Sequence, residues 1–382
     1  MLYPVRKGLP FYHNLLVLKL AGYYPKSSNY NKKLFFYCLV CWMSLWTGTL
    51  WNLIILLYLS IQNKSSHGIT EAMGYLIGNS SLALICLHFA LKHQDWSHLM
   101  DALIDFQKYG KPPKFNTVQT NASKVGITFF KVLFCAAVMY CVLQVLLEEE
   151  CEKKLTFGKT SCGMLLPTWF PASHAESKLA KRLLLIYQLL ACWAIAPFTV
   201  IVSLVLQANE FIAYRIDHLK SLLRKVGSNE NPDLQLHQFL AYVQYHHHII
   251  RLCRKLNYVA KYTTGHVALT FVTVVACFGH HSIQEKSLQS LTYQATYVIS
   301  MCILCYAGQN MQDQMRSIGD ALYSSTWYNC SLKVQKMIPL VLLRTQQPIG
   351  LDAVPLGVFN YMLMVMVLKT TYSYMSFLSR TI

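Results

Sequence analysis

Charged side chains are scarce in this sequence, and acidic ones are the scarcest. Only 13% of the 382 residues are charged, with 17 Asp and Glu against 34 Lys and Arg, whereas soluble domains carry about 25% charged residues. Apolar residues make up 54% of the chain. This balance excludes an ordinary soluble domain and favours a polytopic membrane protein.

Motifs of catalysis are also absent. The sequence contains no Gly-rich phosphate loop, no nucleophile elbow and no paired carboxylates at a cleft, so we do not expect an enzyme. The net charge of +17 has no basic face, finger or helix-turn-helix pattern with it, so we expect no nucleic-acid partner. Basic loops beside the anionic inner leaflet of a bilayer explain that charge. No cleavable signal peptide is evident, because the apolar run Leu15–Leu18 is short.

Neither a metal site nor a disulfide framework is expected. Most of the 13 cysteines fall in apolar stretches or inner loops, where Cys is a small packing residue. Only Cys151 and Cys162 share an outer segment, and the sequence leaves open whether they form a disulfide. The triplet His246-His247-His248 is the most metal-like cluster, but neighbouring residues on a helix point about 100° apart and cannot converge on one ion. We therefore predict no metal and no cofactor.

Long apolar stretches are what the sequence has in abundance. Each has about the twenty residues that a helix needs to cross a bilayer. The seven stretches are 34–60, 68–91, 125–147, 183–207, 262–281, 288–308 and 353–378. The fold class that we predict is therefore all-α, with seven transmembrane helices.

Basic residues orient these helices. An odd number of spans places the chain ends on opposite sides of the membrane. If residues 1–33 are cytoplasmic, the inner segments hold 23 of the 34 Lys and Arg and the outer segments hold nine. Lys and Arg near spans stay on the cytoplasmic side. We therefore predict a cytoplasmic N-terminus and an extracellular C-terminus at 379–382, the reverse of a G-protein-coupled receptor.

The inner segments have helical patterns of their own. Apolar residues continue in helical register beyond the fourth span to Leu223, and a break follows at 227–233. The pattern resumes over 234–260 and again over 311–345. Apolar faces outside the membrane need partners. We predict that these helices, with 309–352 as the last inner segment, extend below the membrane and pack on one another or on another subunit.

Several C-terminal motifs resemble those of insect odorant receptors. They are Cys305-Tyr306-Ala307-Gly308-Gln309-Asn310, Ala321-Leu322-Tyr323-Ser324-Ser325, Trp327-Tyr328, Leu343-Arg344-Thr345-Gln346-Gln347-Pro348, Phe359 and Thr371-Tyr372-Ser373-Tyr374. The outer Pro167-Thr168-Trp169-Phe170-Pro171 and the inner His246 fit looser patterns of the same family. The resemblance is dense over about the last 80 residues, and nothing matches the long second inner loop of the shared co-receptor. It therefore implies a tuning subunit.

That resemblance implies a function. Family members assemble with the co-receptor into a heterotetrameric, odorant-gated, non-selective cation channel in the dendritic or ciliary membrane of olfactory neurons. Their cytoplasmic helices form an anchor between subunits. A gustatory receptor of the same inverted topology is the first alternative, and the Thr371-Tyr372-Ser373-Tyr374 ending argues against it. A G-protein-coupled receptor and a secondary transporter are further alternatives, but their motifs and internal repeats are missing.

In the family the seventh span lines the pore, and one face of stretch 353–378 suits that role. Residues at helical spacing form a stripe that mixes polar groups with an apolar outer end, as expected of a wet path with a hydrophobic constriction. Packing against neighbouring helices is the other interpretation. The predicted pore residues are Asn360, Met364, Val367, Thr371, Tyr374, Met375 and Leu378.

The resemblance also implies an odorant pocket among spans two, three, four and six, in the outer half of the membrane. Such a pocket needs apolar and aromatic walls with few polar groups. Tyr293 and Tyr297 share one helix face and are the best pair. The predicted ligand contacts are Met73, Tyr75, Leu76, Val138, Met139, Cys141, Tyr187, Leu190, Trp193, Tyr293 and Tyr297. Of the N-glycosylation acceptors, only Asn63 falls in an outer loop.

Overall fold

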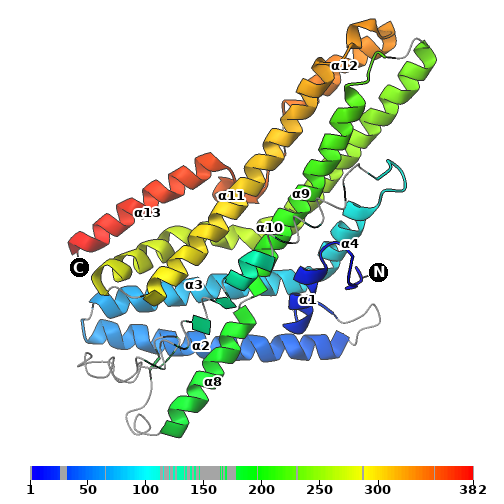
Figure 1. The fold of residues 1–382 in the computed structure, drawn as a ribbon. Helices are drawn as coiled ribbons and strands as arrows, with labels where there is room; N and C mark the ends of the chain where they lie inside the picture. The colour runs from blue at the N-terminus through cyan, green and yellow to red at the C-terminus, as the bar shows by residue number, and fades with distance from the viewer. Residues whose placement is uncertain are drawn as a thin grey trace.

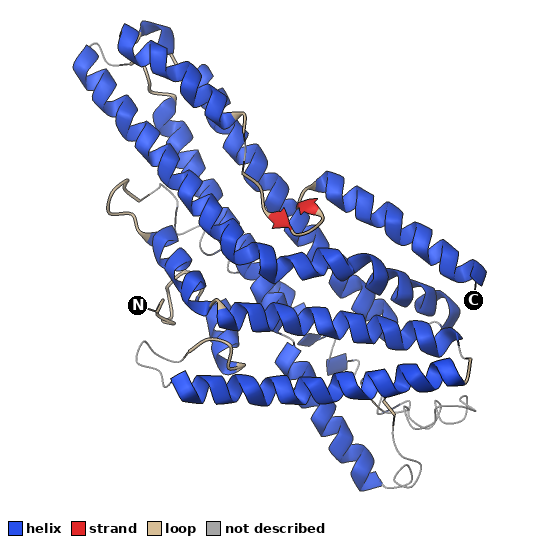
Figure 2. Ribbon diagram, turned by 180° about the vertical axis from the view of Figure 1, so that it is seen from behind, coloured by secondary structure: helices blue, strands red, loops and turns tan. Residues whose placement is uncertain are grey.

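The computed structural model describes residues 2–25, 32–64, 66–111, 178–195, 197–228, 231–285, 288–347 and 349–381, with scattered residues between 115 and 169. In these residues the chain is built of α-helices and one small β-ribbon (Figures 1 and 2). The predicted all-α fold class is confirmed.

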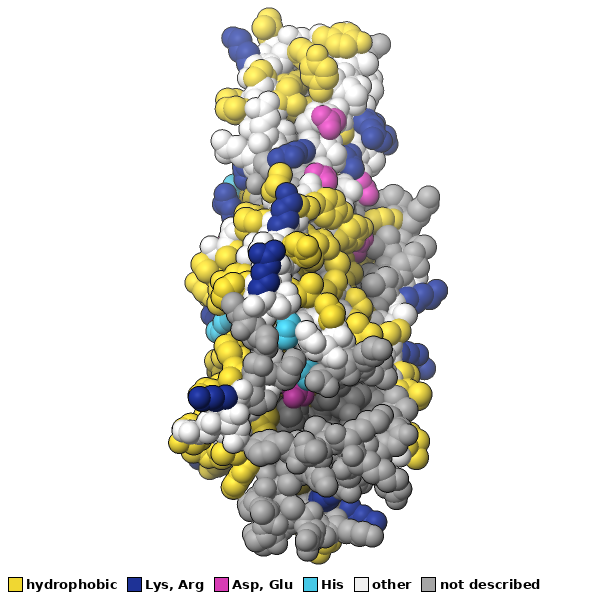
Figure 3. Space-filling view, turned by 90° about the vertical axis from the view of Figure 1, so that its left-hand side faces the viewer, with side chains coloured by type: hydrophobic (Ala, Val, Ile, Leu, Met, Phe, Trp, Pro, Cys, Tyr) yellow, Lys and Arg dark blue, Asp and Glu magenta, His cyan; other side chains and the backbone are white. Residues whose placement is uncertain are grey.

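Helices α2 (Lys32–Gln62) and α3 (Ser66–Leu91) form a hairpin that includes the predicted stretches 34–60 and 68–91. They lie side by side in both ribbon views. Much of α2 is exposed, with Phe36 at 62% and Trp51 at 67% of full exposure. Apolar side chains also spread over the surface in Figure 3. Lipid covers such surfaces in a membrane protein.

Within the described residues, four helical stretches are long and apolar enough to cross a membrane. They are Lys32–Gln62, Gly68–Leu91, Leu179–Leu223 and Pro232–Gln284. The described residues of stretch 125–147 are helical as well. The fourth crossing differs from the prediction, because α8 (Lys178–Ile195) ends and α9 (Pro197–Leu223) begins inside stretch 183–207. Proline lacks a backbone N–H, and it therefore suits the first turn of a helix better than the interior.

Two long helices join the membrane region to an extended arm. α10 (Pro232–Glu285) runs without a break through the predicted inner helix 234–260 and the stretch 262–281. α11 (Leu288–Tyr323) continues stretch 288–308 in the same way. With the end of α9 and with α12 (Leu332–Thr345), they form the arm at the upper right of Figure 1. Phe211, Ile216, Phe239, Leu252 and Ile318 are among its buried residues. The 3-10 helix η2 (Trp327–Asn329) precedes α12.

The last span begins later than predicted. β1 (Asp352–Ala353) pairs antiparallel with β2 (Gly357–Val358), and α13 (Tyr361–Thr381) starts only at Tyr361. A helix from residue 353 is excluded because Gly357 has φ +114° and Pro355 has no N–H to donate. The Asn360 side chain accepts a hydrogen bond of 2.7 Å from the Leu363 backbone N–H and caps the new helix.

Two residues of the C-terminal motifs fix this ribbon to α11. Phe359 is fully buried, and its backbone carbonyl lies directly against Gly308. Any side chain at residue 308 would overlap that carbonyl, so glycine is required for the close approach. On the other side, Asn257 of α10 exchanges two hydrogen bonds with Asp352, of 2.7 and 2.8 Å. The segment that leads into α13 is therefore held by both long helices.

Two short helices, α1 (Tyr12–Leu20) and α4 (His93–Ile104), were not predicted. Arg215 of α9 is only 1% exposed and donates hydrogen bonds to the carbonyls of Ala102 at 3.3 Å, Leu103 at 2.9 Å and Asp105 at 2.7 Å. It thereby satisfies carbonyls that the end of α4 leaves without helical partners. The two chain ends lie at opposite ends of the α2–α3 hairpin, N at its α4 end and C at the other (Figure 1).

Candidate functional site

Three aromatic rings from three helices meet in the membrane region. Tyr75 of α3 contacts Phe278 of α10 with ring centroids 4.8 Å apart and Tyr293 of α11 at 5.0 Å, both edge to face. Phe278 and Tyr293 close the triangle at 5.2 Å. Gly74 permits this packing, because a Cβ there would lie 3.3 Å from both Phe278 and Cys277. Edge-to-face pairs of this kind contribute about 0.5–1.5 kcal/mol beyond their buried area. Tyr75, Phe278 and Tyr293 form what we call the aromatic cluster.

A few polar groups border the aromatic cluster. The Tyr293 hydroxyl donates to Asn79 Oδ1 at 3.3 Å, and Asn79 Nδ2 donates to the Tyr75 carbonyl at 2.9 Å. Tyr297 is 1% exposed, and its hydroxyl donates to the Gly78 carbonyl at 2.8 Å. The site therefore combines aromatic rings with three tyrosine hydroxyls and one amide. That chemistry suits a small, mostly apolar ligand with a polar atom.

The structure brings together three of the predicted ligand contacts, Tyr75, Tyr293 and Tyr297. Phe278 and Asn79 were missed. Asn79 had been considered only as a glycosylation acceptor, although a polar residue in an apolar span is itself a signal of function. Phe278 carried no signal in the sequence, because one more aromatic in a span is usually ordinary packing.

The remaining predicted contacts differ in exposure. Val138 and Met139 are exposed by 45% and 61%, Leu190 by 45% and Met73 by 37%, whereas Leu76 and Trp193 are half-buried. Cys141 lies outside the described residues, as do Cys151 and Cys162. Asn63 is exposed in the turn after α2.

Tyr187 lines a cavity of about 80 Å³ between α2 and α8, apart from the aromatic cluster. Its hydroxyl donates to the Leu45 carbonyl and lies 3.5 Å from that of Thr49. Outer-loop residues are held beside this cavity. Asn52 exchanges hydrogen bonds of 2.8 and 3.1 Å with the backbone of Trp169, and Gln188 bonds the backbone of Leu166. Two residues of the predicted motif, Thr168 and Trp169, thus bond to Gln188 of α8 and Asn52 of α2.

Helix α13 has one buried and one exposed face. Of the predicted pore residues, Val367 and Thr371 are only 2% and 6% exposed, and Asn360, Met364, Met375 and Leu378 are half-buried. Tyr374 is 56% exposed. The opposite face points away from the rest of the chain, with Met362 76%, Tyr372 69% and Phe377 61% exposed. The stripe identified by spacing is therefore mainly the face that packs on the chain's own helices.

Comparison with known proteins decides the family. The model of the 7tm Odorant receptor family matches residues 65–372. This chain belongs to the odorant receptor family. The odorant receptor is similar to Odorant receptor 67c of Drosophila melanogaster, with 23% identity over 179 residues that cover 42% of this chain and 44% of the relative. Putative odorant receptor 85d of the same species is 27% identical over 143 residues, which cover 36% and 33%. The matched part is thus less than half of each relative.

Solved structures extend the comparison to the whole fold. The insect olfactory receptor OR5 from Machilis hrabei, solved in complex with eugenol, matches with a TM-score of 0.78 at 14% identity, over 97% of both chains. Another structure of the same receptor gives a TM-score of 0.78 over 96% of both chains. The odorant receptor therefore shares the all-α fold of these structures, and its long apolar helices make it a multi-pass membrane protein. The gustatory and G-protein-coupled alternatives are not supported.

Proposed function

We propose that this odorant receptor binds small, mostly apolar odorants at the aromatic cluster. The observation that carries the proposal is the meeting of Tyr75, Phe278 and Tyr293 beside the hydroxyls of Tyr293 and Tyr297. Rings supply the wide, rigid walls that bind apolar molecules, and the hydroxyls supply one or two directional hydrogen bonds. The similar receptor OR5 was solved with eugenol, which makes eugenol a suitable first probe.

The proposal continues with a channel. The receptor assembles with the shared co-receptor in the membrane of olfactory sensory neurons and forms an odorant-gated, non-selective cation channel. The exposed face of α13 lines the path, because residues that are buried within one subunit cannot face a pore between subunits. Tyr374 remains a pore residue in this proposal, whereas Val367 and Thr371 serve packing. Exposed apolar residues on the arm, such as Leu332 at 71% and Leu340 at 67%, serve contacts between subunits.

Expression with and without the co-receptor tests this function. Odorant-evoked cation currents should appear only when both subunits are present, and they should persist when G-protein signalling is blocked. Robust currents from this chain alone would contradict the heteromer, and complete loss on blockade would contradict a ligand-gated channel. A cell-surface tag assay belongs to the same experiment: an N-terminal tag should stain only after permeabilisation, and a C-terminal tag on intact cells.

A further inference from the structure

A basic stripe runs along the exposed side of α10 where the helix reaches the membrane. Arg251, Arg254, Lys255 and Tyr258 are exposed. Arg254 and Lys255 lie three and four residues after Arg251 and four and three residues before Tyr258, so the four side chains share one face of the helix. Lys261 continues the stripe and lies over the ring of Tyr262 at 4.7 Å. The apolar stretch 262–281 begins directly after it. The stripe thus ends at the depth of the inner lipid headgroups.

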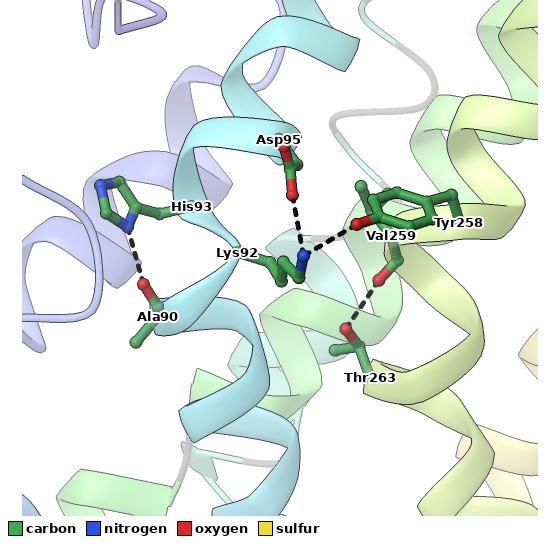
Figure 4. A network of polar contacts seen from close by, with 7 residues as sticks. All are labelled: Ala90, Lys92, His93, Asp95, Tyr258, Val259 and Thr263. Atoms are coloured by element: carbon green, nitrogen blue, oxygen red, sulfur yellow. Dashed lines mark hydrogen bonds and ion pairs between the residues drawn. The ribbon is translucent and has the colours of Figure 1, made fainter.

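A fifth cation reaches the stripe from another helix. Lys92 directly precedes α4 and directly follows the apolar stretch 68–91, and it therefore lies at the same membrane boundary. Its Nζ donates to the Tyr258 hydroxyl at 2.9 Å and pairs with Asp95 Oδ2 at 3.3 Å (Figure 4). The ammonium also lies 5.0 Å from the centre of the Tyr258 ring. His93 points the other way and bonds the Ala90 carbonyl at 2.7 Å.

Charge on this surface is poorly balanced. In the part of the chain that the structure describes, these five cations form one ion pair, between Lys92 and Asp95. The Tyr258 hydrogen bond and Asp95 both raise the pKa of Lys92, so its ammonium stays charged. Tyr258 and Tyr262 are 50% and 51% exposed. Tyrosines at that depth are typical of the membrane interface, where the ring meets lipid and the hydroxyl meets headgroups.

We propose that Lys92, Tyr258 and the basic stripe of Arg251, Arg254, Lys255 and Lys261 bind the headgroup of an anionic membrane phospholipid, with a phosphoinositide as the best fit. Four to eight Lys and Arg immediately beside a span are typical of such sites. Several cations spaced a helical turn apart match several phosphates better than the single phosphate of phosphatidylserine. The membrane depth favours a lipid over a free inositol phosphate. The site is separate from the aromatic cluster and does not depend on odorant binding.

Binding of a fluorescent phosphoinositide to the full-length receptor in phosphatidylcholine nanodiscs tests the proposal. Arg254→Gln combined with Lys255→Gln should weaken binding by roughly 25-fold and Lys92→Gln by roughly fivefold, since each basic residue near the surface contributes about one fivefold step. Asp95→Asn should strengthen binding, because it removes the carboxylate that competes for Lys92. Lys333→Gln with Lys336→Gln, on exposed positions of α12, is the matched control and should change nothing.

Each result decides the question. Losses confined to the stripe variants, together with the gain in Asp95→Asn, support the site and cannot come from misfolding. Equal binding by all variants overturns it. Equal binding of phosphatidylserine overturns the preference for a phosphoinositide. Binding of a soluble inositol phosphate with the same affinity as the lipid overturns the assignment to the membrane.

Discussion

Gly279 of α10 lies beneath the sulfur of Met375 on α13. A Cβ at residue 279 would come within 3.0 Å of Met375 Sδ and 3.3 Å of Gln294 Nε2. The chain neighbours of Gly279 and Gln294 are Phe278 and Tyr293, two members of the aromatic cluster. A ligand that moves the Phe278 ring would therefore act on α10 at the point where this helix meets α13.

This relationship predicts an effect on gating. Gly279→Ala should push Met375 away from α10 and change the maximal odorant current or the resting leak by roughly threefold to tenfold, since overpacking against a flexible side chain costs about 1 kcal/mol. Met375→Ala should restore normal gating in the double variant, because it removes the clash. Current recordings measure both. Additive defects in the double variant would show that the two residues are not coupled.

Loss of a ring should weaken odorant sensitivity. Tyr293→Ala or Tyr297→Ala should shift the dose response by about 5- to 150-fold, because burial of an aromatic-sized surface contributes on the order of 1–3 kcal/mol. Surface expression and the response to a co-receptor agonist should remain. Tyr306→Ala, on an exposed position of the same helix, is the control and should not shift the curve. If both cluster variants keep their sensitivity, the tyrosines are structural.

Accessibility to a thiol reagent should separate the two faces of α13. Tyr374→Cys replaces a side chain that is 56% exposed, and Thr371→Cys replaces one that is 6% exposed. A charged methanethiosulfonate applied from outside should alter the odorant current of Tyr374→Cys and leave Thr371→Cys and the wild type unchanged. If the reagent modifies Thr371→Cys instead, the pore is lined by the stripe that helical spacing predicted, and not by the exposed face.

Acid should destabilise the arm through His246. This side chain is 5% exposed, and burial, with Arg344 and His247 nearby, lowers its pKa to about 4. Between about pH 6.5 and pH 4 the imidazole is protonated in the unfolded chain but neutral in the folded chain. The free energy of unfolding therefore falls as pH drops through this range, by up to roughly 3 kcal/mol. Thermal unfolding of wild type and His246→Gln measures this. The variant should lose much of the pH dependence of its stability. A part of that dependence should remain, because His248 also has a pKa lowered to about 4, mainly by burial.

Arg215 should be a stability residue. Arg215→Met would leave the carbonyls of Ala102, Leu103 and Asp105 without their donor and remove the stacking on Phe106 at 4.7 Å. We expect a loss on the order of 3 kcal/mol, from hydrogen bonds of a charged group. Thermal unfolding checks it, with the exposed Arg224→Gln as control. Equal melting temperatures of the two variants would mean that water replaces the hydrogen bonds of Arg215 to these carbonyls.

Some features could be predicted without the structure because they are local. The length of an apolar run sets the length of a spanning helix, and α2 and α3 therefore begin and end within a few residues of their predicted limits. The break predicted at 227–233 separates α9, which ends at Leu223, from α10, which begins at Pro232, for the same reason, since Gly227, Asn231 and Pro232 act on their own backbone. The charge of the loops likewise predicted an orientation without any knowledge of contacts.

Other features depend on contacts between distant residues, and only the tertiary structure decided them. Helical spacing grouped Val367, Thr371 and Tyr374 on one stripe, but which side of α13 is buried depends on where α10 and α11 lie. Tyr187 is as aromatic as Tyr293, yet one bonds α2 and the other faces Asn79 of α3. Sequence alone determined that this chain is a seven-span member of its class, because hydropathy and charge act residue by residue against lipid and water. Packing decided which residues each helix face contacts. All side chains of a helix project away from its axis, and the positions of the neighbouring helices determine which of them come into contact.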